Sequence, residues 1–231
     1  MSDLKEDLKI IAEAAAAELA DATAIEALEW TARTFGNSFI VASNMQDAVL
    51  IDLATKVKPD IDILFLETGY HFPETIGVRD AVGTVYPDVH IVNAAAEQSV
   101  ADQEAQFGLL YQSDPAQCCH LRKVVPLRRE LAKYDAWVTG VRRVDAPTRA
   151  NTPIVQWDER NGLVKINPIA PWSDDEFNGY LREHGILENL LVQEGYPSIG
   201  CAPCTAKPLP GQDARSGRWA GLAKTECGLH G

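Results

Sequence analysis

Short apolar runs alternate with longer stretches of helical periodicity along most of the chain. Four of these runs have the length and the branched-residue content typical of buried β-strands. They are residues 38–43, 62–66, 89–92 and 136–140. The apolar positions at 48–54, and the sequence from Pro73 toward Tyr86, predict helices between the strands. Strands that alternate with helices predict an α/β fold, a Rossmann-like, mostly parallel sheet with helices on both faces.

Local signals predict further elements on either side of this alternation. Residues 3–20 have the apolar spacing of a surface helix, and Asn161-Gly162 predicts the turn of a hairpin between 154–157 and 163–166. Two capping boxes, each a hydroxyl residue three positions ahead of a glutamate, predict helix N-termini. They are Thr23 with Glu26, for a helix through Thr34, and Ser173 with Glu176, for a helix to about His184.

Polar turns follow three of the predicted strands. Parallel sheets of this kind bind ligands beyond the carboxyl ends of their strands. The turns at Ser43, at Thr68-Gly69 and at Gly140 are therefore expected to surround one pocket. The first of them leads directly into a helix N-terminus, which is a natural site for an anion.

Composition and charge narrow the classes of function. The 231 residues are 46% hydrophobic, enough for one sizeable globular domain, and no apolar run approaches the length of a membrane span. The net charge of -12 argues against a nucleic-acid-binding protein. Residues 118–149 nevertheless carry eight Lys/Arg against three Asp/Glu. This basic stretch indicates either a local anionic ligand or a solvated helix face.

Arginines follow the last predicted strand of the parallel sheet. Arg142 and Arg143 come directly after Gly140-Val141, and Arg149 follows shortly. Guanidinium groups bind phosphate and sulfate oxygens through paired hydrogen bonds. We therefore expect these arginines to bind an anionic ligand rather than to be ordinary surface charge.

The five cysteines form two close pairs and one remainder. Cys118 and Cys119 are adjacent, Cys201 and Cys204 have Cys-x-x-Cys spacing, and Cys227 lies near the C-terminus. Disulfides are not expected, because Met1 is followed by acidic, helical sequence without a signal peptide, which favours a cytoplasmic location. An iron–sulfur cluster, a zinc ion and free buried thiols all remain compatible with the pairs.

The C-terminal segment carries its own candidate chemistry. Glycines between Gly211 and Gly231 indicate flexibility, and Arg215 and Arg218 indicate capture of an anion. Cys227 is a candidate nucleophile, since positive groups such as His230 favour its thiolate form.

Six motifs together resemble the phosphoadenylyl-sulfate reductase family, and within it the assimilatory adenylyl-sulfate (APS) reductases. The motifs span most of residues 38–231. They are Leu66-Glu67-Thr68-Gly69-Tyr70-His71-Phe72-Pro73-Glu74-Thr75, Cys118-Cys119, Gly140-Val141-Arg142-Arg143, Cys201-Ala202-Pro203-Cys204, Arg215-Ser216-Gly217-Arg218-Trp219 and Glu226-Cys227-Gly228-Leu229-His230.

The resemblance implies an adenine nucleotide alpha-hydrolase-type fold and a defined chemistry. It implies reduction of adenylyl sulfate to sulfite and AMP in sulfate assimilation, through a thiosulfonate on Cys227 that thioredoxin or a similar thiol donor resolves. It also implies one 4Fe-4S cluster per chain, on Cys118, Cys119, Cys201 and Cys204. We expect residues 1–204 to form the nucleotide-binding domain and 205–231 a mobile catalytic tail, in a homo-oligomer without nucleic-acid or membrane partners.

The expected site residues fall into two groups. Lys123 and His230 are expected to assist Cys227 in catalysis. The expected substrate-binding residues are Ser43, Gln46, Asp47, Thr68, Gly69, Arg142, Arg143, Arg149, Arg215 and Arg218.

The sequence departs from the related pyrophosphatase loop Ser-Gly-Gly-x-Asp-Ser. Here that loop is Ser43-Asn44-Met45-Gln46-Asp47-Ala48, without either glycine. The change disfavours a backbone cradle for ATP pyrophosphate, and therefore an ATP-using tRNA-thiolation enzyme. Two alternative functions remain. The protein could reduce the 3′-phosphorylated nucleotide, or it could be a nucleotide-binding module that zinc stabilises and that has no catalytic activity.

Overall fold

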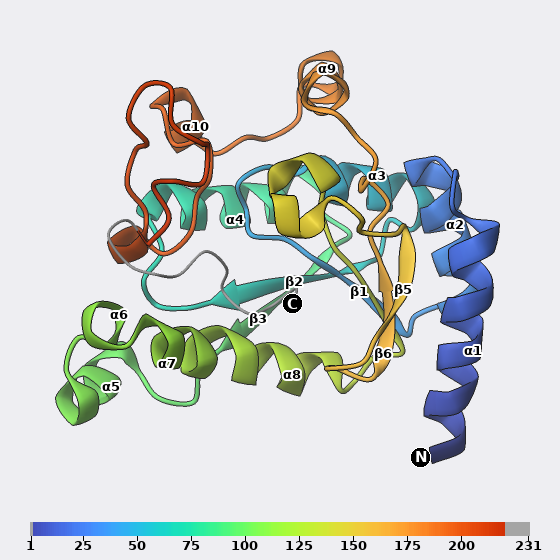
Figure 1. Ribbon diagram of the computed structural model, residues 1–231, viewed down its shortest axis with the longest axis horizontal. Helices are drawn as coiled ribbons and strands as arrows, with labels where there is room; N and C mark the ends of the chain where they lie inside the picture. Colours follow the sequence, from blue (N-terminus) through green and yellow to red (C-terminus); the bar gives the residue numbers. More distant parts are fainter. Residues whose placement is uncertain (1, 220–231) are drawn as a thin grey trace.

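A computed structural model describes residues 2–219 of the chain. Its centre is a six-stranded sheet with the strand order β3-β2-β1-β4-β6-β5 (Figure 1). The strands are β1 (Phe39–Ala42), β2 (Asp62–Glu67), β3 (His90–Ala95), β4 (Ala136–Val138), β5 (Val155–Asp158) and β6 (Leu163–Ile166). Neighbouring strands are parallel from β3 across to β6, and only β5 runs antiparallel, against β6. The predicted α/β fold with a mostly parallel sheet is therefore confirmed.

The central strands are apolar on both sides because helices cover both faces of the sheet. Val41 and Ile63 belong to the larger core, which includes residues of α1 to α4. Ile40, Leu64 and Trp137 point to the opposite face and pack with residues of α8. The two faces are visible as the layers above and below the sheet in Figure 1.

The helices divide between these two layers and the connections at the sheet edge. The longer helices are α1 (Ser2–Glu18), α2 (Ala24–Phe35), α3 (Val49–Val57), α4 (Pro73–Val85), α5 (Val100–Phe107), α8 (Val125–Leu131) and α9 (Asp174–His184). The short ones are α6 (Leu110–Ser113), α7 (Pro115–Cys119), α10 (Leu190–Gln193), the π-helical turn η1 (His120–Val124) and the 3₁₀ turns η2 (Arg143–Asp145), η3 (Pro147–Arg149) and η4 (Ala202–Cys204). Across the described residues 2–219, no helix combines the length and the hydropathy that crossing a membrane would require.

Most of the predicted local elements are confirmed. Both capping boxes form, at Thr23 and at Ser173, and Gly162 has the positive φ of +69° that the hairpin turn requires. The hairpin has a larger role than the sequence indicates, because β6 pairs with β4 and extends the central sheet.

A widened helical turn connects α7 to α8. Pro126 lacks an N–H group, so it cannot donate to the carbonyl of Arg122 four residues earlier, and its ring would crowd that carbonyl in a regular helix. The N–H of Val125 instead bonds the carbonyl of His120, five residues back. We attribute the π-turn to Pro126, and π-turns of this kind often lie at functional sites.

Candidate active site

The two cysteine pairs line one cavity, although more than eighty positions separate them in the sequence. Cys118 and Cys119 end α7, whereas Cys201 and Cys204 border the turn η4. The residues that line this cavity are Thr68, Tyr70, Tyr111, Pro115, Cys118, Cys119, Arg122, Lys123, Cys201, Pro203, Cys204 and Trp219. The fold thus brings together the four cysteines that the sequence analysis grouped as ligands, together with Lys123 and Thr68.

Local hydrogen bonds fix each cysteine pair. Asp114 caps the N-terminus of α7 by accepting from the N–H of Gln117 at 2.9 Å. On the other side of the cavity, Thr205 donates its hydroxyl to the carbonyl of Cys201 at 2.9 Å and accepts from the N–H of Gly200 at 3.2 Å. Both pairs therefore lie on short, capped turns rather than on free loops.

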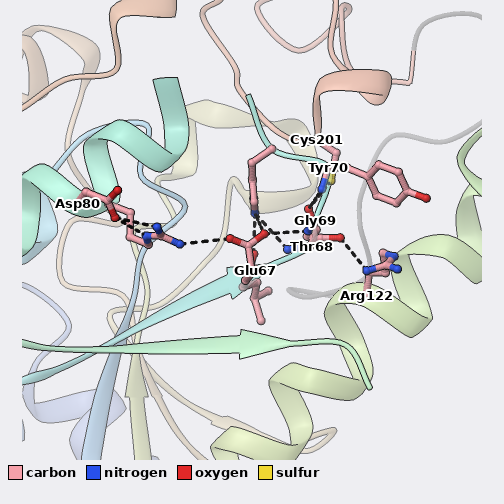
Figure 2. Close-up of polar contacts among 10 residues, drawn as sticks. Glu67, Thr68, Gly69, Tyr70, Asp80, Arg122 and Cys201 are labelled. Carbon is pink, nitrogen blue, oxygen red and sulfur yellow. Dashed lines mark hydrogen bonds and ion pairs between the residues drawn. The ribbon is translucent and has the colours of Figure 1, made fainter. Parts of the chain in front are cut away.

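The turn after β2 ties the two sides of the cavity together (Figure 2). The Oγ1 atom of Thr68 lies 3.4 Å from the Sγ atom of Cys201, and Arg122 donates from Nη1 to the carbonyl of Thr68 at 2.9 Å. The N–H of Ala202 donates to the carbonyl of Tyr70 at 2.7 Å. Thr68 and Arg122 are only 1% and 4% exposed, so these contacts are shielded from water.

Glu67 and Gly69 set the shape of that turn. The carboxylate of Glu67 accepts from the N–H of Gly69 at 2.8 Å, as Figure 2 shows. The same carboxylate pairs with Arg79 at 3.3 Å. Gly69 has a φ of +74°, and a Cβ atom there would lie 2.5 Å from the side chain of Val100. Glycine at this position is therefore required both for the backbone conformation and for the approach of α5.

Burial disfavours thiolates in this cavity. Burial, followed by the neighbouring Cys119, Cys201 and Cys204, raises the pKa of Cys118 to about 11. Burial and the neighbouring cysteines also raise the pKa of Cys204 to about 11, whereas Lys123 and Arg218 act in the opposite direction. A metal group that binds these sulfurs would have to displace their protons.

The four cysteines of the cavity present an all-sulfur donor set. The four thiols are near enough to raise one another's pKa values. A 4Fe-4S cluster presents a separate iron to each thiolate, so an all-cysteine donor set fits it. Four cysteines can also hold one zinc ion.

The arginines after β4 form a second polar group. Arg142 pairs with Asp145 at 2.8 Å and with Asp174 at 2.9 Å, and its guanidinium lies 4.5 Å from the ring centre of Phe177. Arg149 contacts Asp145 more loosely, at 3.5 Å. The two acidic partners balance the charge of Arg142, which fixes the loop after β4 to the start of α9.

Arg143 follows Arg142 in the sequence, but its side chain hydrogen-bonds the main chain. Its Nε donates to the carbonyl of Thr152 at 2.9 Å. Arg142, Arg143 and Arg149 are not among the residues that line the cysteine cavity, so these three predicted anion-binding arginines form a separate group.

The turn after β1 is held by the segment that surrounds α10. Gln46 donates from Nε2 to the carbonyl of Pro197 at 3.2 Å and accepts from the N–H of Ile199 at 2.9 Å. Ser43 accepts from the N–H of Met45 at 3.1 Å. Asp47 accepts from the N–H of Val49 at 3.0 Å, and burial of its carboxyl raises its pKa to about 6.

The segment after Cys204 folds back toward the cavity. Thr205 pairs with Arg218 in a short antiparallel bridge. Trp219 is 2% exposed, and its backbone N–H donates to the carbonyl of Cys204 at 3.0 Å. Arg218 donates to the carbonyl of Ile199 at 3.1 Å, whereas the backbone N–H of Arg215 bonds Asp213. The predicted catalytic residues Cys227 and His230 lie outside the described residues.

The sequence as a whole is similar to one family of sulfur-metabolising enzymes. Residues 37–207 match the family model described as the phosphoadenosine phosphosulfate reductase domain. The chain belongs to this family. The matched residues include the turn after β2, both cysteine pairs and the arginines after β4.

Relatives within the family are similar over nearly the whole chain. A protein from Mycobacteroides abscessus, named adenosine 5′-phosphosulfate reductase, is 65% identical over 226 residues, which cover 97% of this chain and 95% of the relative. Proteins of the same name from Streptomyces coelicolor and Mycobacterium tuberculosis are 56% and 54% identical, over 98% and 96% of this chain and 96% and 94% of their own lengths.

Solved structures agree with the fold. The phosphoadenylyl-sulfate reductase of Candida auris, in a phosphate complex, matches 84% of this chain and 96% of its own with a TM-score of 0.72 and 28% identity. An FMN adenylyltransferase of Candida glabrata matches 88% of this chain and 74% of its own with a TM-score of 0.54, but at 13% identity it shows the fold alone.

Some cavity residues were not singled out by the sequence. Tyr70 and Tyr111 meet edge to face with ring centres 5.3 Å apart, and Tyr70 donates its hydroxyl to Glu104 at 2.8 Å. Their signal was weak, since isolated tyrosines on helices and turns are common. Arg122 follows Cys119 by three positions, lies in the π-turn η1 and is 4% exposed.

Proposed function

We propose that the protein reduces adenylyl sulfate to sulfite and AMP, with reduced thioredoxin or a similar dithiol protein as the electron donor. Two lines support the proposal: the membership of the family, and the name shared by relatives at 54–65% identity over nearly full length. The single structural observation that carries it is the cavity shared by Cys118-Cys119 and Cys201-Cys204 with Lys123 beside it. The fifth cysteine, Cys227, is then available for chemistry.

The reaction proceeds through two displacements at sulfur. The thiolate of Cys227 attacks the sulfate sulfur, and the bond from that sulfur to the bridging oxygen breaks, so AMP leaves with the electron pair. The product on the protein is a thiosulfonate, Cys227-S-SO₃⁻. A donor thiolate then attacks Sγ of Cys227, sulfite leaves, and the second donor thiol reduces the mixed disulfide. Two donor thiols are oxidised to one disulfide as one sulfate group is reduced to sulfite.

The four cysteines of the cavity would hold one 4Fe-4S cluster. When bound, the cluster would supply fixed negative charge and a scaffold, without an open position for substrate, since each iron carries a cysteine ligand. Lys123 lies in the cavity wall, where an ammonium group balances negative charge from the cluster side and from an incoming phosphosulfate.

The substrate-binding residues divide by their observed contacts. Thr68 and Gly69 form the turn at the cavity, and Ser43, Gln46 and Asp47 shape the turn after β1. Arg143, Arg149, Arg215 and Arg218 supply positive charge for the phosphosulfate. Arg142, which already pairs with Asp145 and Asp174, holds the loop that bears Arg143 and Arg149.

The C-terminal tail is proposed to act as the moving part. Residues 1–204 bind the nucleotide and the cluster, and the tail from 205 onward delivers Cys227, with His230 favouring its ionised form. A reducing compartment such as the cytoplasm keeps this thiol available. Assembly into a homo-oligomer stays a prediction.

The deciding experiment measures both products. Protein purified without air is mixed with adenylyl sulfate and reduced thioredoxin, and sulfite and AMP are quantified with time. We expect equal amounts of the two, and at most one AMP per chain when thioredoxin is left out. Release of pyrophosphate from ATP without any sulfite would instead place the protein with the adenylating, ATP-using enzymes.

A further inference from the structure

The loop after β1 has the backbone conformation of glycine at a residue that is not glycine. Met45 has a φ of +58°, in the left-handed region that residues with a Cβ atom rarely adopt. It occupies the position of the second glycine in the related Ser-Gly-Gly-x-Asp-Ser loop. Its side chain is 0% exposed and belongs to the larger core. The conformation costs energy at a methionine, so other contacts must hold it.

Side chains bond both main-chain polar groups of Met45. The hydroxyl of Ser43 accepts from its N–H at 3.1 Å. Its carbonyl accepts from Nδ2 of Asn189 at 3.4 Å, and the same Nδ2 donates to Oγ1 of Thr75 at 3.2 Å. Asn189 is 0% exposed, so without these two acceptors its amide hydrogens would be buried and unpaired. The amide of Asn189 therefore fixes the direction of the Met45 carbonyl.

The segment around Asn189 also pairs with this loop through the main chain. Asn189 donates its N–H to the carbonyl of Gln46 at 2.8 Å, and Ala48 donates its N–H to the carbonyl of Leu187 at 2.9 Å. The two bonds belong to one short antiparallel bridge between the segments. Asn189 thus holds a loop from which 144 positions of the sequence separate it.

The loop lies where the strand order of the sheet reverses. The chain passes from β1 to β2 and β3 on one side, and then returns to place β4 on the other side of β1. Open α/β sheets bind ligands beyond the carboxyl ends of their strands at such a point. The loop follows the carboxyl end of β1, so its conformation sets the shape that a ligand meets there.

We propose that Asn189 is a positioning residue, which holds Met45 in the left-handed conformation and thereby keeps the loop after β1 shaped for the nucleotide. That the ligand is a nucleotide rests on the proposed function. Because Asn189 is fully buried, it acts through the loop and not by touching the ligand. Without its amide, Met45 would spend time in right-handed or extended conformations, and only the left-handed fraction would bind the nucleotide well.

The first test replaces Asn189 by serine. Asn189 caps α10 by accepting from the N–H of Leu191 at 3.1 Å, and serine is also a good N-cap residue. Serine is too short, however, to reach the carbonyl of Met45. Dissociation constants for AMP are compared between the wild type and Asn189→Ser. We expect about tenfold weaker binding in the variant, which corresponds to a competent fraction of about one in ten.

Two substitutions of Met45 separate the backbone role of Asn189 from packing. Met45→Ala and Met45→Gly both remove the buried side chain, but only glycine adopts a positive φ without strain. Adding Asn189→Ser should weaken AMP binding by about tenfold in the Met45→Ala protein and by less than about twofold in the Met45→Gly protein. An equal effect in both proteins would show that Asn189 acts through packing alone, and would overturn the proposal.

Hydrogen exchange reports on the loop without any nucleotide. Asn189→Ser should speed exchange in the peptide that contains residues 43–48 and leave the hairpin at 155–166 unchanged. Unchanged exchange in the loop peptide, or an equal rise in both peptides, would overturn the positioning role. A wild type that binds no AMP would instead count against the nucleotide site of the proposed function, so the two failures are told apart.

Discussion

The hydroxyl of Thr68 lies 3.4 Å from the sulfur of Cys201, a residue 133 positions further along the chain. The same hydroxyl oxygen accepts from the N–H of Tyr70 at 3.2 Å, and the carbonyl of Tyr70 accepts from the N–H of Ala202. One threonine therefore links the turn after β2 to the start of the second cysteine pair. The position of Cys201 depends on this turn as much as on its own loop.

Replacing Thr68 by valine should loosen this link. The change keeps the shape of the side chain but leaves the partly buried N–H of Tyr70 without its acceptor, which should cost about 1 kcal/mol in the free energy of unfolding. Urea unfolding at matched cofactor content measures the loss. Thr68→Ser keeps the hydroxyl and should lose less than half as much. Equal stability of the valine variant and the wild type would show that the contact contributes nothing.

The metal content of the cavity should depend on each cysteine of the two pairs. Cys118→Ser or Cys201→Ser removes one of the four proposed ligands, so iron, acid-labile sulfide and visible absorption should fall toward zero. Cys227→Ser serves as the matched control and should keep all three. A colourless wild type that contains zinc would contradict the cluster, as would full iron content in either ligand variant.

The sequence predicted the fold well because the signals were local. Each central strand is a short apolar run, and each capping box forms within four residues, so neither depends on distant contacts. The place of β6 in the sheet was not predictable in this way. Its pairing with β4 is decided by which edge of the parallel sheet is open and by α1, which packs on β5 and β6.

The sequence predicted which residue types form the candidate site, but not how their side chains are arranged. The cysteine pairs carried a specific spacing, and the structure places both pairs around one cavity. Arg122 and Lys123 looked alike in the sequence, yet the π-turn buries Arg122 and leaves Lys123 partly exposed.

Asp47 should make stability depend on pH in a predictable direction. Its pKa is raised from an ordinary 3.8 to about 6 in the folded protein, mainly by burial of the carboxyl. Ionisation therefore opposes folding, and the penalty grows between pH 4 and 6 and then stays constant. Asp47→Asn keeps an acceptor for Val49 and should raise the free energy of unfolding by about 3 kcal/mol at pH 7.5. Chemical unfolding at pH 4 and 7.5 checks this, and an equal gain at both values would contradict it.

The nucleotide without a 3′-phosphate should be the preferred substrate. Relatives at 54–65% identity carry the name adenosine 5′-phosphosulfate reductase, which supports this choice. The measurement is kcat/KM for adenylyl sulfate and for its 3′-phosphorylated form in direct competition. We expect a preference of at least about a hundredfold, equivalent to about 3 kcal/mol in the transition state. Equal values would contradict this preference.

Cys227 should behave as a nucleophile and not as a metal ligand. If four other cysteines hold the cluster, Cys227→Ser should fold, stay coloured and bind AMP as the wild type does. Sulfite formation should fall by more than about 10³-fold, because an alkoxide forms far less readily than a thiolate and no thiosulfonate can form. Substitution of His230 should cost less than loss of the thiol, since a neighbouring residue only tunes ionisation and position.

The intermediate itself distinguishes this mechanism from the alternatives. Wild-type protein mixed with adenylyl sulfate and no reductant should gain the mass of one SO₃ group and release one AMP per chain. Peptide mapping should place that mass on the C-terminal peptide that contains Cys227, and reduced thioredoxin should remove it as sulfite. Attack by one thiol on a thiosulfonate releases sulfite directly, so rapid release of sulfite by reduced thioredoxin supports an adduct on a cysteine sulfur. An adduct on Cys118 or Cys204, or an active Cys227→Ser enzyme, would rule out Cys227 as the residue that accepts sulfur from the substrate.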